Sequence, residues 1–159
     1  MKIKLSIDGV YIVKLAQIVN EGGTLMHMLR SDSVDFTRFG ECYFSEVLPG
    51  TIKAWKLHPK QTQNLAVPIG QISLVIYDDR DNSITRGNLE VLQLGRPDSY
   101  SRVCIPPNLW YGFTCISDSP ALLVNCSDLP HDPSDSKVIH VNDKKIPYSW
   151  PNNIWNSSN

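Results

Sequence analysis

Residues 50–80 constrain the fold more than any other part of the chain, because two apolar runs of strand character flank a polar insert. The second run, residues 65–78, is rich in valine and isoleucine, and Pro68 and Gly70 mark a bend where a strand turns a corner. The polar side chains of the first run and the insert are Lys53, Lys56, His58, Lys60, Gln61 and Gln63. The mouth of a small antiparallel barrel is where such groups converge, so we expect a site there.

The rest of the chain has the same β character. Residues 102–113 read as a short strand, a rigid corner at Pro106 and Pro107, and an aromatic strand that contains Gly112. The hydrophobic period is near two in residues 41–47. Few windows of ten residues lack β-branched residues, glycine or proline. These patterns predict an all-β antiparallel barrel with little helix.

Composition indicates one domain, residues 1–159, whose residues 145–159 form a polar C-terminal tail anchored by Trp150 and Trp155. Fifteen basic and sixteen acidic side chains give a net charge of −1, without a basic stripe, so we expect no nucleic-acid partner. No stretch approaches about 20 apolar residues, and no secretory signal is evident, so we expect no membrane partner and a cytoplasmic location. The four cysteines stand in apolar contexts and are expected to be buried thiols.

Several short motifs follow one another in a fixed order. They are Thr51 to Lys56, Gly70 with Tyr77-Asp78-Asp79-Arg80, Ser83 to Gly87, Ile105-Pro106-Pro107 with Gly112-Phe113, Asn125-Cys126-Ser127-Asp128, and Val141-Asn142-Asp143 before Ser149-Trp150-Pro151. In this order, from about residue 21 to residue 151, they resemble the dTDP-4-dehydrorhamnose 3,5-epimerase family. The resemblance implies a cupin-type jelly roll, a nucleotide-sugar ligand and a homodimer in which strands cross between subunits. Residues 2–13, read as one alternating strand, would suit that exchange.

The chemistry that the resemblance implies is proton abstraction from a carbon beside a 4-keto group. It requires a base, a donor for the developing enolate, and an acid on the opposite face of the sugar. This chain departs from the family at each position. Lys56 replaces the family's catalytic histidine, Gln63 the enolate-stabilising lysine, Tyr111 a second histidine, and Val124 the acid tyrosine.

Other side chains can take over this chemistry. His58 is a ready base because imidazole titrates near neutrality, and Lys56 is the alternative if its amine is deprotonated. Residues 56 and 58 share one face of a strand. Tyr111 is the candidate acid. The competing interpretations are a surface loop for His58, a core-capping tyrosine for Tyr111, and a solvated rim for Lys60.

The resemblance also suggests substrate-binding residues. Lys53 occupies the position of the family's diphosphate-binding arginine, and Glu41 and Tyr43 occupy those of a glutamine and an asparagine. Gln61 and Gln63 are further candidates from the insert. Many cupins bind a metal through several histidines, but here His58 stands alone near the mouth, so we predict no metal and no cofactor.

Three functions remain open. The first is a divergent 3,5-epimerase-like isomerase that acts on a nucleotide-linked 4-keto-6-deoxy sugar in cell-surface polysaccharide biosynthesis. The second is a catalytically inactive cupin that binds a sugar nucleotide or a partner protein, and the third is a 3,4-ketoisomerase-like cupin. The density of titratable groups at the mouth favours the first.

Overall fold

A computed structural model describes residues 1–151, and within this range it contains strands and turns but no helix. None of these residues therefore forms a helix long and apolar enough to span a membrane. The strands are β1 (Lys2–Lys4), β2 (Tyr11–Lys14), β3 (Gln17–Asn20), β4 (Gly23–Met26), β5 (Glu41–Val47), β6 (Ile52–Leu57), β7 (Gln63–Ile69), β8 (Gln71–Tyr77), β9 (Leu89–Gly95), β10 (Ser101–Ile105), β11 (Trp110–Cys115), β12 (Ala121–Ser127) and β13 (Lys137–Val138).

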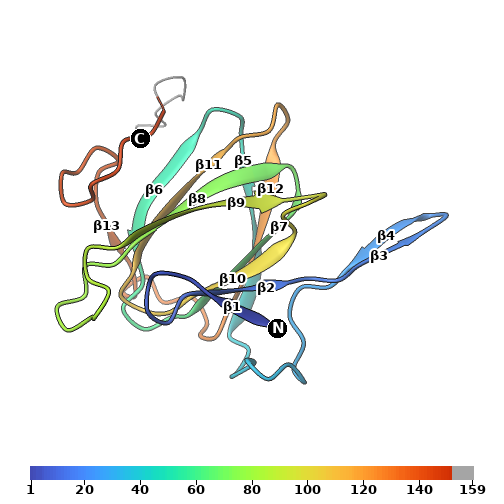
Figure 1. Ribbon diagram of the computed structural model, residues 1–159, viewed down its shortest axis with the longest axis horizontal. Helices are drawn as coiled ribbons and strands as arrows, with labels where there is room; N and C mark the ends of the chain where they lie inside the picture. Colours follow the sequence, from blue (N-terminus) through green and yellow to red (C-terminus); the bar gives the residue numbers. More distant parts are fainter. Residues whose placement is uncertain (152–159) are drawn as a thin grey trace.

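Two antiparallel sheets face each other and form the walls of a barrel (Figure 1). The six-stranded sheet has the order β1-β2-β10-β7-β12-β5, and the five-stranded sheet has the order β13-β6-β11-β8-β9. Apart from the consecutive pairs β1–β2 and β8–β9, neighbouring strands in each sheet are distant in sequence, as in a jelly roll. The prediction of an all-β, cupin-type jelly roll is confirmed.

The core lies between the sheets and is made by the inward side chains of alternating strand positions. Val67, Val103 and Leu123 reach it from the six-stranded sheet, and Leu74 and Ile76 from the five-stranded sheet. Each is at most 2% exposed. Burial of such a side chain contributes roughly 1.5–3 kcal/mol, so these contacts hold the two walls together.

A second apolar cluster covers part of the five-stranded sheet from outside. Trp55 of β6 lies at its centre, with its ring 5.2 Å from that of Trp150 and 6.1 Å from that of Tyr148. Ile146 is also buried in this cluster. The first part of the expected polar tail is thus packed on the barrel, with Trp150 as the predicted anchor. Trp155 lies outside the described residues.

The expectation of one N-terminal strand over residues 2–13 was wrong. This segment forms β1 and most of β2, which pair with each other, and Gly9 lies in the connecting turn with a φ of +84°. A side-chain-free residue adopts this left-handed conformation without strain, so the chain reverses there. The bend at Gly70, whose φ is +69°, separates β7 from β8 as predicted.

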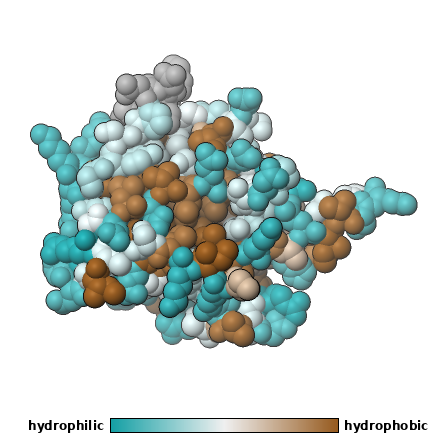
Figure 2. Space-filling model, viewed as in Figure 1, coloured by the Kyte–Doolittle hydropathy of each residue, from teal (hydrophilic) through white to brown (hydrophobic). Residues whose placement is uncertain are grey.

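A hairpin of β3 and β4 projects from the barrel (Figure 1). Ile18, Val19 and Leu25 are each more than half exposed on it. Figure 2 shows this apolar surface on the hairpin. It is separate from the larger apolar area at the centre of the same face.

The cysteine prediction holds for three of the four thiols. Cys104, Cys115 and Cys126 are buried, but Cys42 on the edge strand β5 is exposed. Cys42 lies directly opposite Cys126 in the ladder, and their Sγ atoms are 3.3 Å apart. All four are free thiols.

Candidate functional site

A cavity of about 290 Å³ lies between the two sheets, toward the end of the barrel where β5 and β6 face each other. Its walls combine polar and aromatic side chains from both sheets. Those used below are Tyr43 and Ser45 from β5, Lys53 and Lys56 from β6, and Tyr111 and Phe113 from β11.

Strand register brings the two central wall residues together. Lys56 is paired with Tyr111 across β6 and β11, and both line the cavity. Their neighbours Leu57 and Trp110 belong instead to the outer cluster. The alternation of a β-strand therefore separates the polar wall from the outer apolar layer, as predicted for the face that carries residue 56.

His58 follows β6 and is buried beside this wall. Its Nδ1 lies 2.7 Å from the main-chain oxygen of Asp135 and 3.9 Å from the Oδ2 of the same residue. Its ring stacks on that of Tyr111, with centroids 6.2 Å apart and an angle of 21° between the planes. Within residues 1–151, Nε2 has no hydrogen-bond partner and no solvent access.

These contacts define the protonation state of His58. A carbonyl oxygen only accepts hydrogen bonds, so Nδ1 carries the proton and Nε2 has the free lone pair. Burial, followed by the positive charge of Lys56, lowers the pKa of His58 below its usual value, and Asp135 opposes this effect. The ring is therefore a neutral base at pH 7. Burial raises the pKa of Tyr111, which remains a protonated phenol.

Asp135 is a site residue that the sequence analysis missed. Its carboxylate is 2% exposed, and Oδ2 accepts a hydrogen bond of 3.1 Å from the main-chain nitrogen of Gln61. The other oxygen, Oδ1, has no partner in the described part of the chain. Asp135 comes 77 residues after His58 in a proline-bracketed loop, and no periodic pattern there indicates a buried carboxylate.

Gln61 and Gln63 belong to a buried chain of amides and are not in the cavity wall. Gln63 donates to Gln61 Oε1 over 3.2 Å, and its own Oε1 accepts from Asn125 Nδ2 over 2.5 Å. Asn125 Nδ2 also donates to the Tyr43 hydroxyl over 2.8 Å. The chain of amides thus ends at a phenol in the cavity. Asn125 was not predicted, although a polar residue inside the apolar run 121–126 is a detectable signal.

The other predicted residues are more peripheral. Lys53 lines the cavity, and its Nζ donates to Ser45 Oγ over 3.0 Å and to the main-chain oxygen of Glu46 over 2.6 Å. Burial lowers the pKa of Lys53. Glu41 begins β5 outside the wall. Lys60 is 65% exposed, which agrees with the solvated-rim interpretation.

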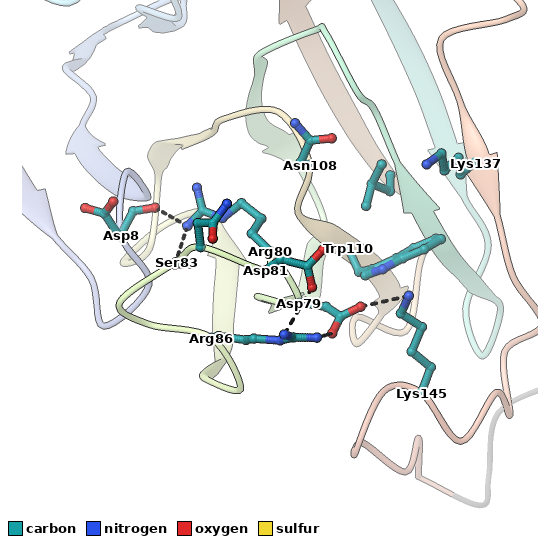
Figure 3. A pocket seen from close by; sticks show the side chains of 12 residues that line it. Asp8, Asp79, Arg80, Asp81, Ser83, Arg86, Asn108, Trp110, Lys137 and Lys145 are labelled. Atoms are coloured by element: carbon teal, nitrogen blue, oxygen red, sulfur yellow. Dashed lines mark hydrogen bonds and ion pairs between the residues drawn. The ribbon is translucent and has the colours of Figure 1, made fainter.

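A larger hollow of about 760 Å³ lies outside the barrel, between the loop after β8 and the chain around Lys137 and Lys145 (Figure 3). Three of its cations are already paired with carboxylates. Arg80 pairs with Asp78 at 2.8 Å, Arg86 with Asp79 and Asp81 at 3.3 and 3.1 Å, and Lys145 with Asp79 at 2.7 Å. The inner cavity, with a neutral histidine buried beside its wall, is the better candidate for chemistry.

A family model described as dTDP-4-dehydrorhamnose 3,5-epimerase matches residues 4–159. This chain belongs to the dTDP-4-dehydrorhamnose 3,5-epimerase family. The match begins at the end of β1, covers every later strand, and confirms the family resemblance of the sequence motifs.

Family relatives include two curated proteins. The spore coat polysaccharide biosynthesis protein SpsL of Bacillus subtilis strain 168 is 30% identical over 146 residues, which are 91% of this chain and 96% of SpsL. The probable low-salt glycan biosynthesis epimerase Agl13 of Haloferax volcanii is 33% identical over 145 residues, with 90% and 89% covered. A crystal structure of a dTDP sugar isomerase from Desulfovibrio desulfuricans G20 is 49% identical, has a TM-score of 0.92, and covers 93% of this chain and 94% of its own.

The structure places the residues that the motif resemblance aligned with the family's site. Lys56 lies in the cavity wall at the position where the motif resemblance places a histidine, and His58 lies two residues later beside Asp135. Gln63, at the position of the expected lysine, is part of the buried amide chain. The cavity wall therefore holds two lysines, Lys53 and Lys56, with the free Nε2 of His58 buried beside it.

Proposed function

We propose that this chain is an epimerase of a nucleotide-linked 4-keto-6-deoxy sugar, acting by proton abstraction beside the keto group in the synthesis of a surface polysaccharide or glycan. The observation that carries this proposal is the free Nε2 of His58, a neutral lone pair in a buried position beside a polar cavity. A base poised near the operating pH, oriented through its other nitrogen, suits general base catalysis. Family membership supports the substrate class.

In this mechanism His58 is the base and Asp135 orients it. The hydrogen bond to the Asp135 main-chain oxygen fixes the tautomer, and the carboxylate 3.9 Å away stabilises the imidazolium that forms when Nε2 takes a proton. Nε2 is shielded in this structure, so the substrate reaches it once the side chain of Tyr111 or Lys56 shifts. Hydrogen bonds of catalysis commonly tighten only when substrate is bound.

Lys56 is the donor to the enolate. Its ammonium group is close enough to His58 to lower the pKa of the imidazole, and its side chain lines the cavity. A cation at the keto oxygen stabilises the negative charge that develops there, which Gln63 in its buried chain does not reach. Lys53, at the open side of the wall, is the candidate contact for the diphosphate.

Deuterium exchange tests the proposal. The protein is incubated with dTDP-4-keto-6-deoxyglucose in deuterated water, and the C3 and C5 positions are followed by NMR. We expect deuterium at one or both carbons. Movement of the keto group from C4 to C3 would instead favour the 3,4-ketoisomerase-like function. No label, with a folded protein that binds the nucleotide sugar, would favour the catalytically inactive binding protein.

Substitutions assign the roles within the site. His58→Gln should abolish exchange, because the amide has no basic lone pair, and Lys56→Met should slow it by roughly 10²–10³-fold through loss of enolate stabilisation. His27→Gln is the matched control, since His27 follows β4 and is not part of the cavity lining. Exchange by His58→Gln at the wild-type rate, together with its loss in Lys56→Met, would assign the base to Lys56.

We also propose a homodimer in the cytoplasm. The projecting β3–β4 hairpin, with Ile18, Val19 and Leu25 exposed, supplies apolar surface suited to a second subunit. Analytical ultracentrifugation at micromolar concentration tests the assembly, and a monomeric mass would count against it.

A further inference from the structure

Inversion at a carbon needs proton transfer at two faces. The base removes the proton from one face of the sugar, and a different group must deliver a proton to the other face. A single group on one side would only return the carbon to its starting configuration. The wall opposite His58 and Lys56 must therefore hold an acid, and this inference rests on the proposed epimerase function.

Tyr43 is the ionisable side chain that the six-stranded sheet contributes to the cavity lining within residues 1–151. It comes from β5, whereas His58, Lys56 and Tyr111 come from or directly follow strands of the five-stranded sheet. The two sheets face each other across the cavity. Tyr43 therefore lies across the cavity from the wall formed by Lys56 and Tyr111, and His58 lies behind that wall with its ring stacked on Tyr111.

The hydrogen bonding of Tyr43 leaves its proton available. Asn125 Nδ2 donates to the Tyr43 oxygen over 2.8 Å, so the oxygen acts as the acceptor in this contact and its own O–H can point into the cavity. Asn125 is fully buried and is fixed in turn by Gln63 Oε1 and by the main-chain nitrogen of Asn64. An amide held in this way also stabilises the phenolate that remains after proton donation.

Tyr111 is less suited to this role. Its ring stacks on His58, and its strand is paired with the strand of Lys56, so it lies on the side of the base. Burial raises the pKa of Tyr111 strongly. For Tyr43, burial also raises the pKa, but the hydrogen bond from Asn125 offsets part of this effect. Of the two tyrosines that line the cavity, Tyr43 is thus the one whose hydroxyl is held by a fixed donor, the Asn125 amide.

We propose that Tyr43 is the catalytic acid, delivering its proton to the face of the sugar opposite His58. In the first step His58 Nε2 takes the proton, and the electron pair of the C–H bond enters the enolate. In the second step the enolate carbon takes the Tyr43 proton and forms the new C–H bond, which leaves a phenolate held by Asn125. The net transfer is one proton from tyrosine to histidine, and solvent reverses it between turnovers.

The test separates exchange from inversion. In deuterated water with dTDP-4-keto-6-deoxyglucose, Tyr43→Phe should still label the unreacted substrate, because His58 removes the proton and returns deuterium from the same face. Net inversion should fall by about 10²–10⁴-fold, the usual contribution of a general acid. Tyr111→Phe tests the competing assignment. Tyr77→Phe, on the outer side of the barrel, is the matched control and should keep inversion within a few-fold of the wild type.

Inversion by Tyr43→Phe at nearly the wild-type rate would overturn the assignment, as would loss of inversion with retained labelling in Tyr111→Phe. The Tyr111 variant decides the question even if the Tyr43 variant folds poorly, which circular dichroism would reveal. Absence of label in the wild-type protein would refute the proposed function itself, before either tyrosine is considered.

Discussion

Asn125→Ala should destabilise the protein and disconnect Tyr43 from the core. The substitution removes the acceptor of the Asn64 main-chain nitrogen and the donor to Gln63 Oε1, and both of these groups are buried. A buried polar group left without a partner costs about 1–3 kcal/mol, so two of them cost about 2–6 kcal/mol. The Tyr43 hydroxyl adds little to this cost, because Tyr43 is 37% exposed and water can replace the amide.

Urea unfolding followed by tryptophan fluorescence measures this loss, with Asn82→Ala, an exposed asparagine, as the control at about 0.5 kcal/mol or less. The Asn125 bond lowers the pKa of Tyr43, so its removal should raise that pKa, and ultraviolet titration of the wild type and the variant detects the change. A loss of stability below about 1 kcal/mol, or an unchanged titration, would refute the account of the buried amide chain.

Two further predictions concern stability and thiol chemistry. Asp78 is fully buried and accepts bonds from Arg80, Ser83 and Thr85, which hold its pKa well below the usual value; Asp78→Ala should cost about 3–5 kcal/mol at pH 7. Because this pKa is lower in the folded state, the stabilisation is complete above about pH 5 and is lost as the pH falls; a difference between variant and wild type that is constant from pH 7 to pH 3 would contradict this. Mild oxidation by diamide should join Cys42 and Cys126, whose Sγ atoms are 3.3 Å apart, with loss of two hydrogen atoms detectable by mass spectrometry of unreduced peptides. Diamide treatment that leaves both thiols free would contradict the contact.

The fold was predictable from local patterns, since strand period, proline and glycine act within a few residues of one another. The bend at Gly70 and the corner at Pro106 were recognised for this reason. The N-terminal segment was misread because alternation continues on both sides of Gly9, and only the positive φ reveals the turn.

The site was predictable only in part. Lys53, Lys56 and Tyr111 were placed in the wall by strand alternation and family motifs. Gln63 was assigned to the substrate, but its amide is engaged by Asn125, a pairing across two strands that no local pattern encodes. Asp135 depends on a loop contact 77 residues away, which sequence periodicity does not carry.

Trp55 belongs both to the cavity lining and to the apolar cluster on the outer face of the barrel. One part of this residue lines the cavity, its ring lies against Trp150, and its main chain exchanges hydrogen bonds of 3.2 and 3.3 Å with Ile139. The cavity wall is thus only one residue thick at Trp55, and the chain after β13 supports it from outside. Substrate selectivity in such a barrel can be retuned from the outside, by residues that never meet the ligand, while the catalytic groups stay in place.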